Sequence, residues 1–163
     1  MNNKIKNNFL VYRDYKLKCS IGKSGITSSK REGDLATPRG LYKLGLLYYR
    51  KDRLKVPRCN IRKKNIKKNM GWCNDSKSKS YNKEITFPYK YTAEKLFRRD
   101  KKYDLLIVLK YNISPVIKKK GSAIFIHLTN KTYRQTAGCN PITREDFLKI
   151  LPLINNKTKI KIN

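Results

Sequence analysis

Hydrophobic and polar residues alternate with a period of two near both ends of the chain, the pattern of strands with one buried face. In the segment 15–21 every second residue is apolar or aromatic: Tyr15, Leu17, Cys19 and Ile21. The segment "TKIKI" at 158–162 alternates in the same way. We therefore predict a half-buried strand early in the chain and another at its close.

Three longer runs are predominantly apolar. They are "LYKLGLLYY" (41–49), "YDLLIVLKYN" (103–112) and "GSAIFIHL" (121–128). The last two are rich in β-branched and aromatic residues and are bounded by polar, Gly or Pro residues, which predicts central buried strands. We predict that the first run is also a strand.

Helical signals are confined to two short segments. "YTAEKLFRR" (91–99) offers Thr92 as a cap and predicts a short helix. "TREDFLKIL" (143–151) begins with Thr143 and places Asp146 three residues on, close to a capping box. The apolar face and the end of this second helix are supplied by Phe147, Leu148, Leu151 and Pro152.

The remaining long segments predict irregular structure. Residues 27–40 are rich in turn formers and predict a loop, and the basic residues 50–70 predict an exposed excursion. No internal repeat and no Gly/Ser linker divides the sequence. We predict one domain, 1–163, that is mostly β with one or two short helices.

The charge is strongly positive, with 40 Lys and Arg against 11 Asp and Glu, a formal net charge of +29. One interpretation is a nucleic-acid binder, because clustered cations release counterions from phosphate backbones. The other is codon bias, since Lys, Asn and Ile are all abundant. The densest stretch, 50–69, lacks the aromatic spacing of a base-stacking surface. The charge therefore predicts only non-specific binding to polyanions, a cell wall included.

No stretch approaches the ~20 apolar residues that span a bilayer, so we expect no membrane span. Near the start only "FLVY" (9–12) is apolar, which is too short for the core of a signal peptide. The cysteines show no CxxC spacing, and a single histidine cannot complete a zinc set, so we expect neither a metal nor an organic cofactor. If Cys139 is a working thiol, at most one disulfide joins the other three, Cys19, Cys59 and Cys73.

Two sequence patterns suggest a functional site: a possible phosphate-binding loop, which we reject, and a histidine–cysteine pair. "IGKSG" (21–25) contains the GKS of a phosphate loop, but Leu17 stands where the Walker pattern requires glycine. The other pair is His127, at the end of an apolar run, and Cys139 behind Gly138. The loop 128–138 is long enough to return the thiol to the imidazole, which would serve as its base.

The surroundings of Cys139 also suit catalysis. Gly138 frees the backbone, so that amides around 138–139 converge on an oxyanion. A helix that begins near Thr143 would favour a thiolate if it is oriented well. From spacing alone, a structural histidine and a structural thiol remain the alternative.

The segment "SAIFIHL…TAGCNPITREDFLKIL" resembles the catalytic segment of the L,D-transpeptidase (YkuD-like) family, whose pattern is a strand-end His, a spacer and [ST]-x-G-C. The pattern is met here by His127, Thr136, Gly138 and Cys139. Residues 19–44 resemble the family's early strand and its G-D-x-x-T-P-x-G loop. "GWCNDSKSKSYNK" (71–83) and residues 93–112 resemble the middle of a subfamily of short, single-domain members.

This resemblance implies a mostly β, sandwich-like catalytic domain that acts on peptidoglycan stem peptides. Cys139 would attack the carbonyl at the L-centre of a diamino acid, next to a terminal D-amino acid. His127 would take the thiol proton and pass it to the leaving amine. An acceptor amine would then resolve the thioester as a crosslink, or water would trim the stem. Gly138 would serve the oxyanion, with φ freedom alone as the alternative role. The Thr136 carbonyl would orient the imidazole unless Thr136 is a plain loop residue.

Substrate-binding roles are predicted with alternatives. Trp72 is a wall of the substrate groove or a core anchor, and Asp75 binds a substrate amine or caps a turn. Weaker candidates are Tyr81 and Asn82. Many members carry His before the Gly-Cys and Arg two residues after the Cys, where this chain has Ala137 and Pro141. Arg134 or Arg144 would then grip the substrate carboxylate.

Two rival functions stay open at this stage. One is an L,D-carboxypeptidase that uses the same cysteine and histidine, and the other is a catalytically idle, basic protein that binds nucleic acid or cell wall. The resemblance implies a location in the cell envelope or periplasm, although no signal peptide is visible. The oligomeric state is open.

Overall fold

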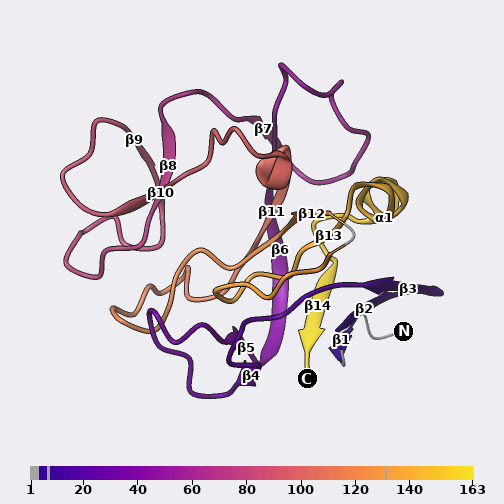
Figure 1. The fold of residues 1–163 in the computed structure, drawn as a ribbon, viewed down its shortest axis with the longest axis horizontal. Coiled ribbons are helices and arrows are strands. Elements are labelled where there is room, and N and C mark those ends of the chain that lie inside the picture. Colours follow the sequence, from indigo (N-terminus) through magenta and orange to yellow (C-terminus); the bar gives the residue numbers. More distant parts are fainter. Residues whose placement is uncertain (1–3, 7, 131) are drawn as a thin grey trace.

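The computed structural model of the protein describes residues 4–6, 8–130 and 132–163. Within these ranges the largest sheet has nine strands in the order β13-β12-β11-β6-β14-β1-β2-β3, with β7 paired to β6 (Figure 1). Its strands are β1 (Lys4–Lys6), β2 (Phe9–Tyr12), β3 (Tyr15–Lys18), β6 (Gly40–Tyr49), β7 (Lys63–Asn65), β11 (Leu105–Leu109), β12 (Phe125–Thr129), β13 (Ile142–Thr143) and β14 (Lys159–Ile162).

Two smaller sheets and short helical segments complete the described fold. The three-stranded sheet has the order β10-β8-β9, and β4 pairs with β5 in parallel. Their bounds are β4 (Ile26–Thr27), β5 (Thr37–Pro38), β8 (Met70–Cys73), β9 (Glu84–Thr86) and β10 (Ala93–Lys95). The helical segments are α1 (Arg144–Ile150) and the 3₁₀ turns η1 (Lys101–Tyr103) and η2 (Leu151–Leu153). None of the helices in the described ranges has the length and apolar character that a membrane crossing requires.

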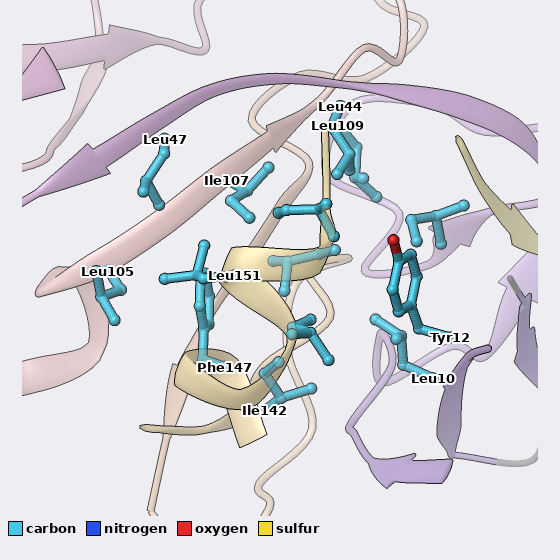
Figure 2. Packing of buried hydrophobic residues seen from close by; sticks show 14 of the residues in the cluster. Leu10, Tyr12, Leu44, Leu47, Leu105, Ile107, Leu109, Ile142, Phe147 and Leu151 are labelled. Carbon is cyan, nitrogen blue, oxygen red and sulfur yellow. The ribbon is translucent and has the colours of Figure 1, made fainter. Parts of the chain in front are cut away.

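Strand β11 separates two hydrophobic clusters, because its side chains alternate between the faces of the sheet. Leu105, Ile107 and Leu109 pack with Phe147 of α1 in the first cluster (Figure 2). Leu106 and Val108 pack on the opposite face. We call this second group the site-side cluster; its buried members are Tyr48, Ile66, Met70, Trp72, Leu96, Tyr103, Leu106, Val108 and Phe125. This two-sided burial explains why β11 is apolar throughout.

The predicted fold class is confirmed, and so are the strands of the central runs and the last strand. Helix α1 also forms as predicted, with the Thr143 hydroxyl accepting from the Asp146 N–H at 3.2 Å. Its predicted apolar face is partly wrong. Leu148 is 44% exposed, and Ile150 is buried in its place. The helical period turns 147, 150 and 151 toward the core and leaves 148 outside.

The helix predicted over 91–99 is wrong. Ala93–Lys95 forms strand β10 and pairs with β8, and the Asn74 N–H donates to the Thr92 carbonyl at 3.3 Å. This pairing with a distant segment outweighs a weak local helix preference.

Three other segments differ in part from their predictions. The early strand ends at Lys18, and Tyr15 is 39% exposed although Leu17 and Cys19 are buried. The loop 27–40 contains the short strand β5. Residues 50–70 include strand β7, and their buried apolar side chains include Leu54, Ile61, Ile66 and Met70.

Candidate active site

His127 lies on β12 opposite Leu106 of β11, so its side chain faces the site-side cluster. Its Nδ1 is 2.8 Å from the Leu128 carbonyl oxygen. Because a carbonyl oxygen can only accept, Nδ1 carries the proton and Nε2 keeps a lone pair. The ring of Tyr103 meets the imidazole edge-on, with ring centroids 5.2 Å apart. Packing and one hydrogen bond therefore fix the orientation of the ring and its tautomer.

Burial lowers the pKa of His127 to about 4. The hydrogen bond to Leu128 raises this pKa, and the positive charges of Lys102 and Arg98 lower it. At neutral pH the imidazole is therefore uncharged, and its Nε2 can accept a proton.

Cys139 is half-buried and packs against the site-side cluster. Its thiol donates a hydrogen bond to the Ala123 carbonyl oxygen at 3.2 Å. Phe125 and His127 of β12 are two residues apart and share one face of the sheet, and Ala123 packs against the same cluster. The thiol and the imidazole therefore occupy the same face of the sheet. All four cysteines are free, which leaves the sulfur of Cys139 available for chemistry.

Burial raises the pKa of the Cys139 thiol to about 12, and the negative charge of Glu94 acts in the same direction. A hydrogen bond from the Phe125 backbone and the positive charge of Lys30 act in the opposite direction. The resting site thus holds a neutral thiol and a neutral imidazole. The sequence predicted that a helix beginning near Thr143 would favour a Cys139 thiolate. Burial of the thiol is the largest influence on its pKa, so the thiol stays neutral beside α1.

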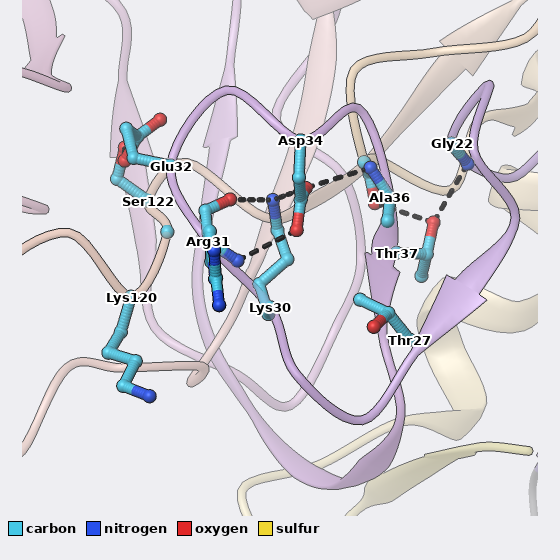
Figure 3. A network of polar contacts seen from close by, with 12 residues as sticks. Gly22, Thr27, Lys30, Arg31, Glu32, Asp34, Ala36, Thr37, Lys120 and Ser122 are labelled. Carbon is cyan, nitrogen blue, oxygen red and sulfur yellow. Dashed lines mark hydrogen bonds and ion pairs between the residues drawn. The ribbon is translucent and has the colours of Figure 1, made fainter.

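Thr37 joins the loop of the T-P-x-G motif to the segment that carries Cys139, and Figure 3 shows its contact with Gly22. Its hydroxyl accepts from the Gly22 N–H and donates to the Gly138 carbonyl, both at 2.9 Å. Gly138 has a φ of +139°, and a Cβ at this position would lie 2.8 Å from the Ala36 carbonyl oxygen. The close approach of the two segments therefore requires glycine at 138.

Inside the same loop, Lys30 and Asp34 form an ion pair at 2.5 Å (Figure 3). Asp34 also accepts from the N–H groups of Arg31 and Ala36 at 2.7 and 2.9 Å. The pKa of Asp34 is lowered by these partners, although burial opposes them. This network shapes the loop that contacts Gly138.

Thr136 organises the chain before the nucleophile. Its N–H donates to Ile21, and its carbonyl accepts from Lys23 at 2.9 Å. Its hydroxyl donates to the Cys139 carbonyl at 2.7 Å and accepts from the Gly138 N–H at 3.1 Å. Together these hydrogen bonds fix the backbone conformation of residues 136–139.

Two predicted roles change as a result. The carbonyl in contact with His127 Nδ1 belongs to Leu128, whereas the carbonyl of Thr136 accepts from the Lys23 N–H. The Gly138 N–H is also engaged, by the Thr136 hydroxyl. Of the two amides predicted for the oxyanion, the amide of Cys139 therefore stays the candidate, and its role stays a prediction.

The structure places three predicted substrate-binding residues in the interior. Trp72, Tyr81 and Asn82 are buried, and Trp72 packs edge-on against Phe125 at 5.3 Å between ring centroids. The Asn82 side-chain oxygen accepts from Trp72 Nε1 and from the Ala123 N–H. Trp72 packs in the cluster that contains Cys139, and Asn82 contacts Ala123, whose carbonyl accepts from the thiol. Direct contact with substrate stays a prediction for all three residues.

Two other predicted residues lie nearer the surface. Asp75 is half-buried, and its Oδ1 accepts from the Lys77 N–H at 2.9 Å, so it caps a turn. Arg134 is exposed in the loop before Cys139, and Arg144 is exposed at the start of α1. Their contacts with a substrate stay predictions.

Residues that the sequence reasoning missed contribute to the site. The Tyr103 hydroxyl donates to Glu94, whose charge acts on Cys139. Burial raises the pKa of Tyr103 well above its usual value, and the charges of Cys139 and Glu94 add to this. Neither residue stands in a recognisable motif, whereas Thr37 belongs to the T-P-x-G loop. Among the described residues, no three side chains of the His, Cys, Asp and Glu types gather as metal ligands.

Comparison with known proteins agrees with this geometry. A family model described as YkuD, the L,D-transpeptidase catalytic domain, matches residues 4–162. No curated protein and no solved structure matches the chain.

Proposed function

The chain belongs to the YkuD family of L,D-transpeptidase catalytic domains, and we propose that it crosslinks peptidoglycan stem peptides through a thioester on Cys139. The observation that supports the proposal is the presence of a free thiol and a neutral imidazole on one face of the sheet. Cys139 forms no disulfide, and neither side chain belongs to a potential metal-ligand group among the described residues. Each side chain is held by a contact with a backbone carbonyl.

In the first step the Cys139 sulfur attacks the carbonyl carbon of the donor stem, and the thiol proton passes to Nε2 of His127. The C–N bond of the terminal D-amino acid then breaks, and the leaving amine takes that proton. This is general acid–base catalysis by one imidazole. In the second step an acceptor amine attacks the thioester carbon, and His127 takes a proton from the attacking nitrogen. The C–S bond then breaks, the proton passes to the sulfur, and the new amide and the free Cys139 thiol remain.

The neutral resting state determines how the first step proceeds. A thiol with a pKa of about 12 supplies almost no thiolate at neutral pH, so proton removal accompanies attack. The S–H bond must leave the Ala123 carbonyl and turn toward the imidazole. The Cys139 N–H stabilises the oxyanion, and the exposed Arg134 binds a substrate carboxylate. We place this reaction in the cell envelope, where the polymer lies.

Product analysis tests the proposal. Purified protein is incubated with a disaccharide-tetrapeptide from peptidoglycan, with Cys139→Ala as the matched control. Crosslinked dimers from the unaltered protein alone are the expected result. Shortened monomers alone would instead identify an L,D-carboxypeptidase. Equal turnover by the Cys139→Ala variant, or none by either protein, would overturn the proposal.

A further inference from the structure

Glu94 stands beside the nucleophile on the strand that the sequence predicted as a helix. It pairs with Trp72 across β10 and β8, and residues opposite one another in an antiparallel pair share a face. Trp72 packs with Tyr103 and Cys139 in the site-side cluster. The Tyr103 hydroxyl donates to Glu94 Oε1, which confirms that the carboxylate faces this side.

The carboxylate has no part in the steps proposed above, and its charge opposes them. Burial raises the pKa of Glu94, and the hydrogen bond from Tyr103 lowers it. Its negative charge raises the pKa of the Cys139 thiol and so disfavours the thiolate. The positive charges of Arg98 and Lys102 act on Glu94 and lower its pKa, yet the carboxylate still raises the pKa of Cys139. A further cation bound directly to the carboxylate would therefore favour the thiolate.

Asn74 supplies a second acceptor on the same face. Its N–H donates to the Thr92 carbonyl at 3.3 Å and so continues the β8–β10 ladder by one pair. Alternation along the strand places residue 74 on the same face as residue 72. The Asn74 Oδ1 atom is buried and has no hydrogen-bond partner in the described part of the chain. A buried acceptor without a donor is unfavourable and is suited to a ligand that brings one.

We propose that Glu94 and Asn74 form a subsite for the primary ammonium group of the acceptor stem peptide. An ammonium group carries three donors and no acceptor, which matches one carboxylate and one amide oxygen. Its charge also cancels that of Glu94 and so relieves the field on the sulfur. One ammonium proton passes to the Glu94 carboxylate before transfer, which frees the amine lone pair for attack on the thioester. This assignment of the acceptor rests on the proposed function, whereas ammonium binding beside Cys139 does not depend on it.

The first experiment measures ammonium binding without turnover. The rate of Cys139 alkylation by iodoacetamide is followed by peptide mass spectrometry at constant ionic strength, with increasing propylammonium chloride. Tetramethylammonium chloride, which has no N–H donor, is the matched salt. We expect propylammonium alone to accelerate alkylation severalfold with saturation. We expect Glu94→Gln to remove this response, and Glu145→Gln on the exposed face of α1 to keep it. No acceleration, or equal acceleration in Glu94→Gln, would overturn the subsite.

The second experiment assigns the subsite to the acceptor. The acyl-enzyme is divided between an amine-bearing acceptor peptide and hydroxylamine, which is largely uncharged at neutral pH. We expect Glu94→Gln and Asn74→Ala to lower the ratio of peptide transfer to hydroxylamine trapping at least tenfold. An unchanged ratio would reject the acceptor assignment. Failure of the proposed function is distinct, because the unaltered protein would then form no acyl-enzyme, and the alkylation assay would decide the subsite.

Discussion

The ring of Tyr103 meets the imidazole of His127 edge-on, at 5.2 Å between centroids and with 70° between the ring planes. The hydroxyl of the same tyrosine donates to Glu94, whose charge acts on Cys139. One side chain of η1 thus joins the base to the carboxylate beside the nucleophile. This arrangement explains how the buried histidine keeps a fixed orientation beside the cluster that contains Cys139.

Replacing His127 with Gln should slow acylation by a donor stem peptide about 10²- to 10⁴-fold, because the general base is lost. Single-turnover mass spectrometry measures the acylation rate, and thermal unfolding shows whether the variant is folded. Alkylation of Cys139 by iodoacetamide at high pH, where hydroxide supplies the thiolate, serves as the control for an intact nucleophile. Acylation within tenfold of the unaltered protein would exclude His127 as the base.

The reactivity of Cys139 should rise with pH without a plateau. The thiol pKa of about 12 predicts a roughly tenfold increase in the alkylation rate per pH unit between about 7 and 10, because the thiolate is the reactive form. Peptide mapping after iodoacetamide treatment separates Cys139 from the other cysteines. A plateau below about pH 8 would show a thiolate–imidazolium pair in the resting site and contradict the neutral pair.

His127 should make the fold less stable in mild acid. Its pKa is about 4 in the folded protein and about 6.5 in an unfolded chain, so the unfolded state binds the proton first as the pH falls. Stability is therefore lost between about pH 6.5 and 4, by about 3 kcal/mol in total. Urea unfolding of the protein and of His127→Gln at pH 7 and 4.5 measures this difference. Equal losses in both proteins would contradict it.

Gly138→Ala should destabilise the fold more than Gly33→Ala. Both glycines have positive φ, but a Cβ at 138 would lie 2.8 Å from the Ala36 carbonyl oxygen, whereas nothing lies within 4 Å at 33. We expect about 1 kcal/mol from backbone conformation alone at 33 and roughly 3 kcal/mol at 138. Urea unfolding compares the two variants. Equal effects would show that the contact with Ala36 is unimportant.

Thr37→Val should cost about 1–3 kcal/mol of unfolding free energy, although valine has nearly the same shape. The change leaves the buried Gly22 N–H and Gly138 carbonyl without the hydroxyl that joins them. Thr27→Val is the control, because its hydroxyl accepts only an exposed contact from Ser29. Urea unfolding measures both variants, and a Thr37→Val protein as stable as the control would refute this role.

The sequence predicted those parts of the fold that depend on local patterns. The apolar run of β11 and the capped helix α1 could be read directly, because burial on both faces and a capping threonine leave clear marks. Strand β10 could not be predicted from the local sequence, because it is stabilised by pairing with the distant strand β8.

The same division applies to the site. His127 and Cys139 stand in a recognisable motif, and so does Thr37. Glu94 is brought to the sulfur only by the pairing of distant strands, and no residue near it in the sequence indicates this. The sequence also could not predict that Cys139 and His127 are both neutral at rest, because the burial that shifts their pKa values arises only in the packed structure.

Mass spectrometry of the acylated protein tests the central claim most directly. The protein and its Cys139→Ala variant are incubated with a donor stem peptide, and the acyl group is located by peptide mapping. We predict a mass increase equal to the donor acyl group on Cys139 of the unaltered protein and no increase in the variant. The acyl group on Cys19, Cys59 or Cys73, or on the Cys139→Ala variant, would contradict the assignment of Cys139 as the nucleophile.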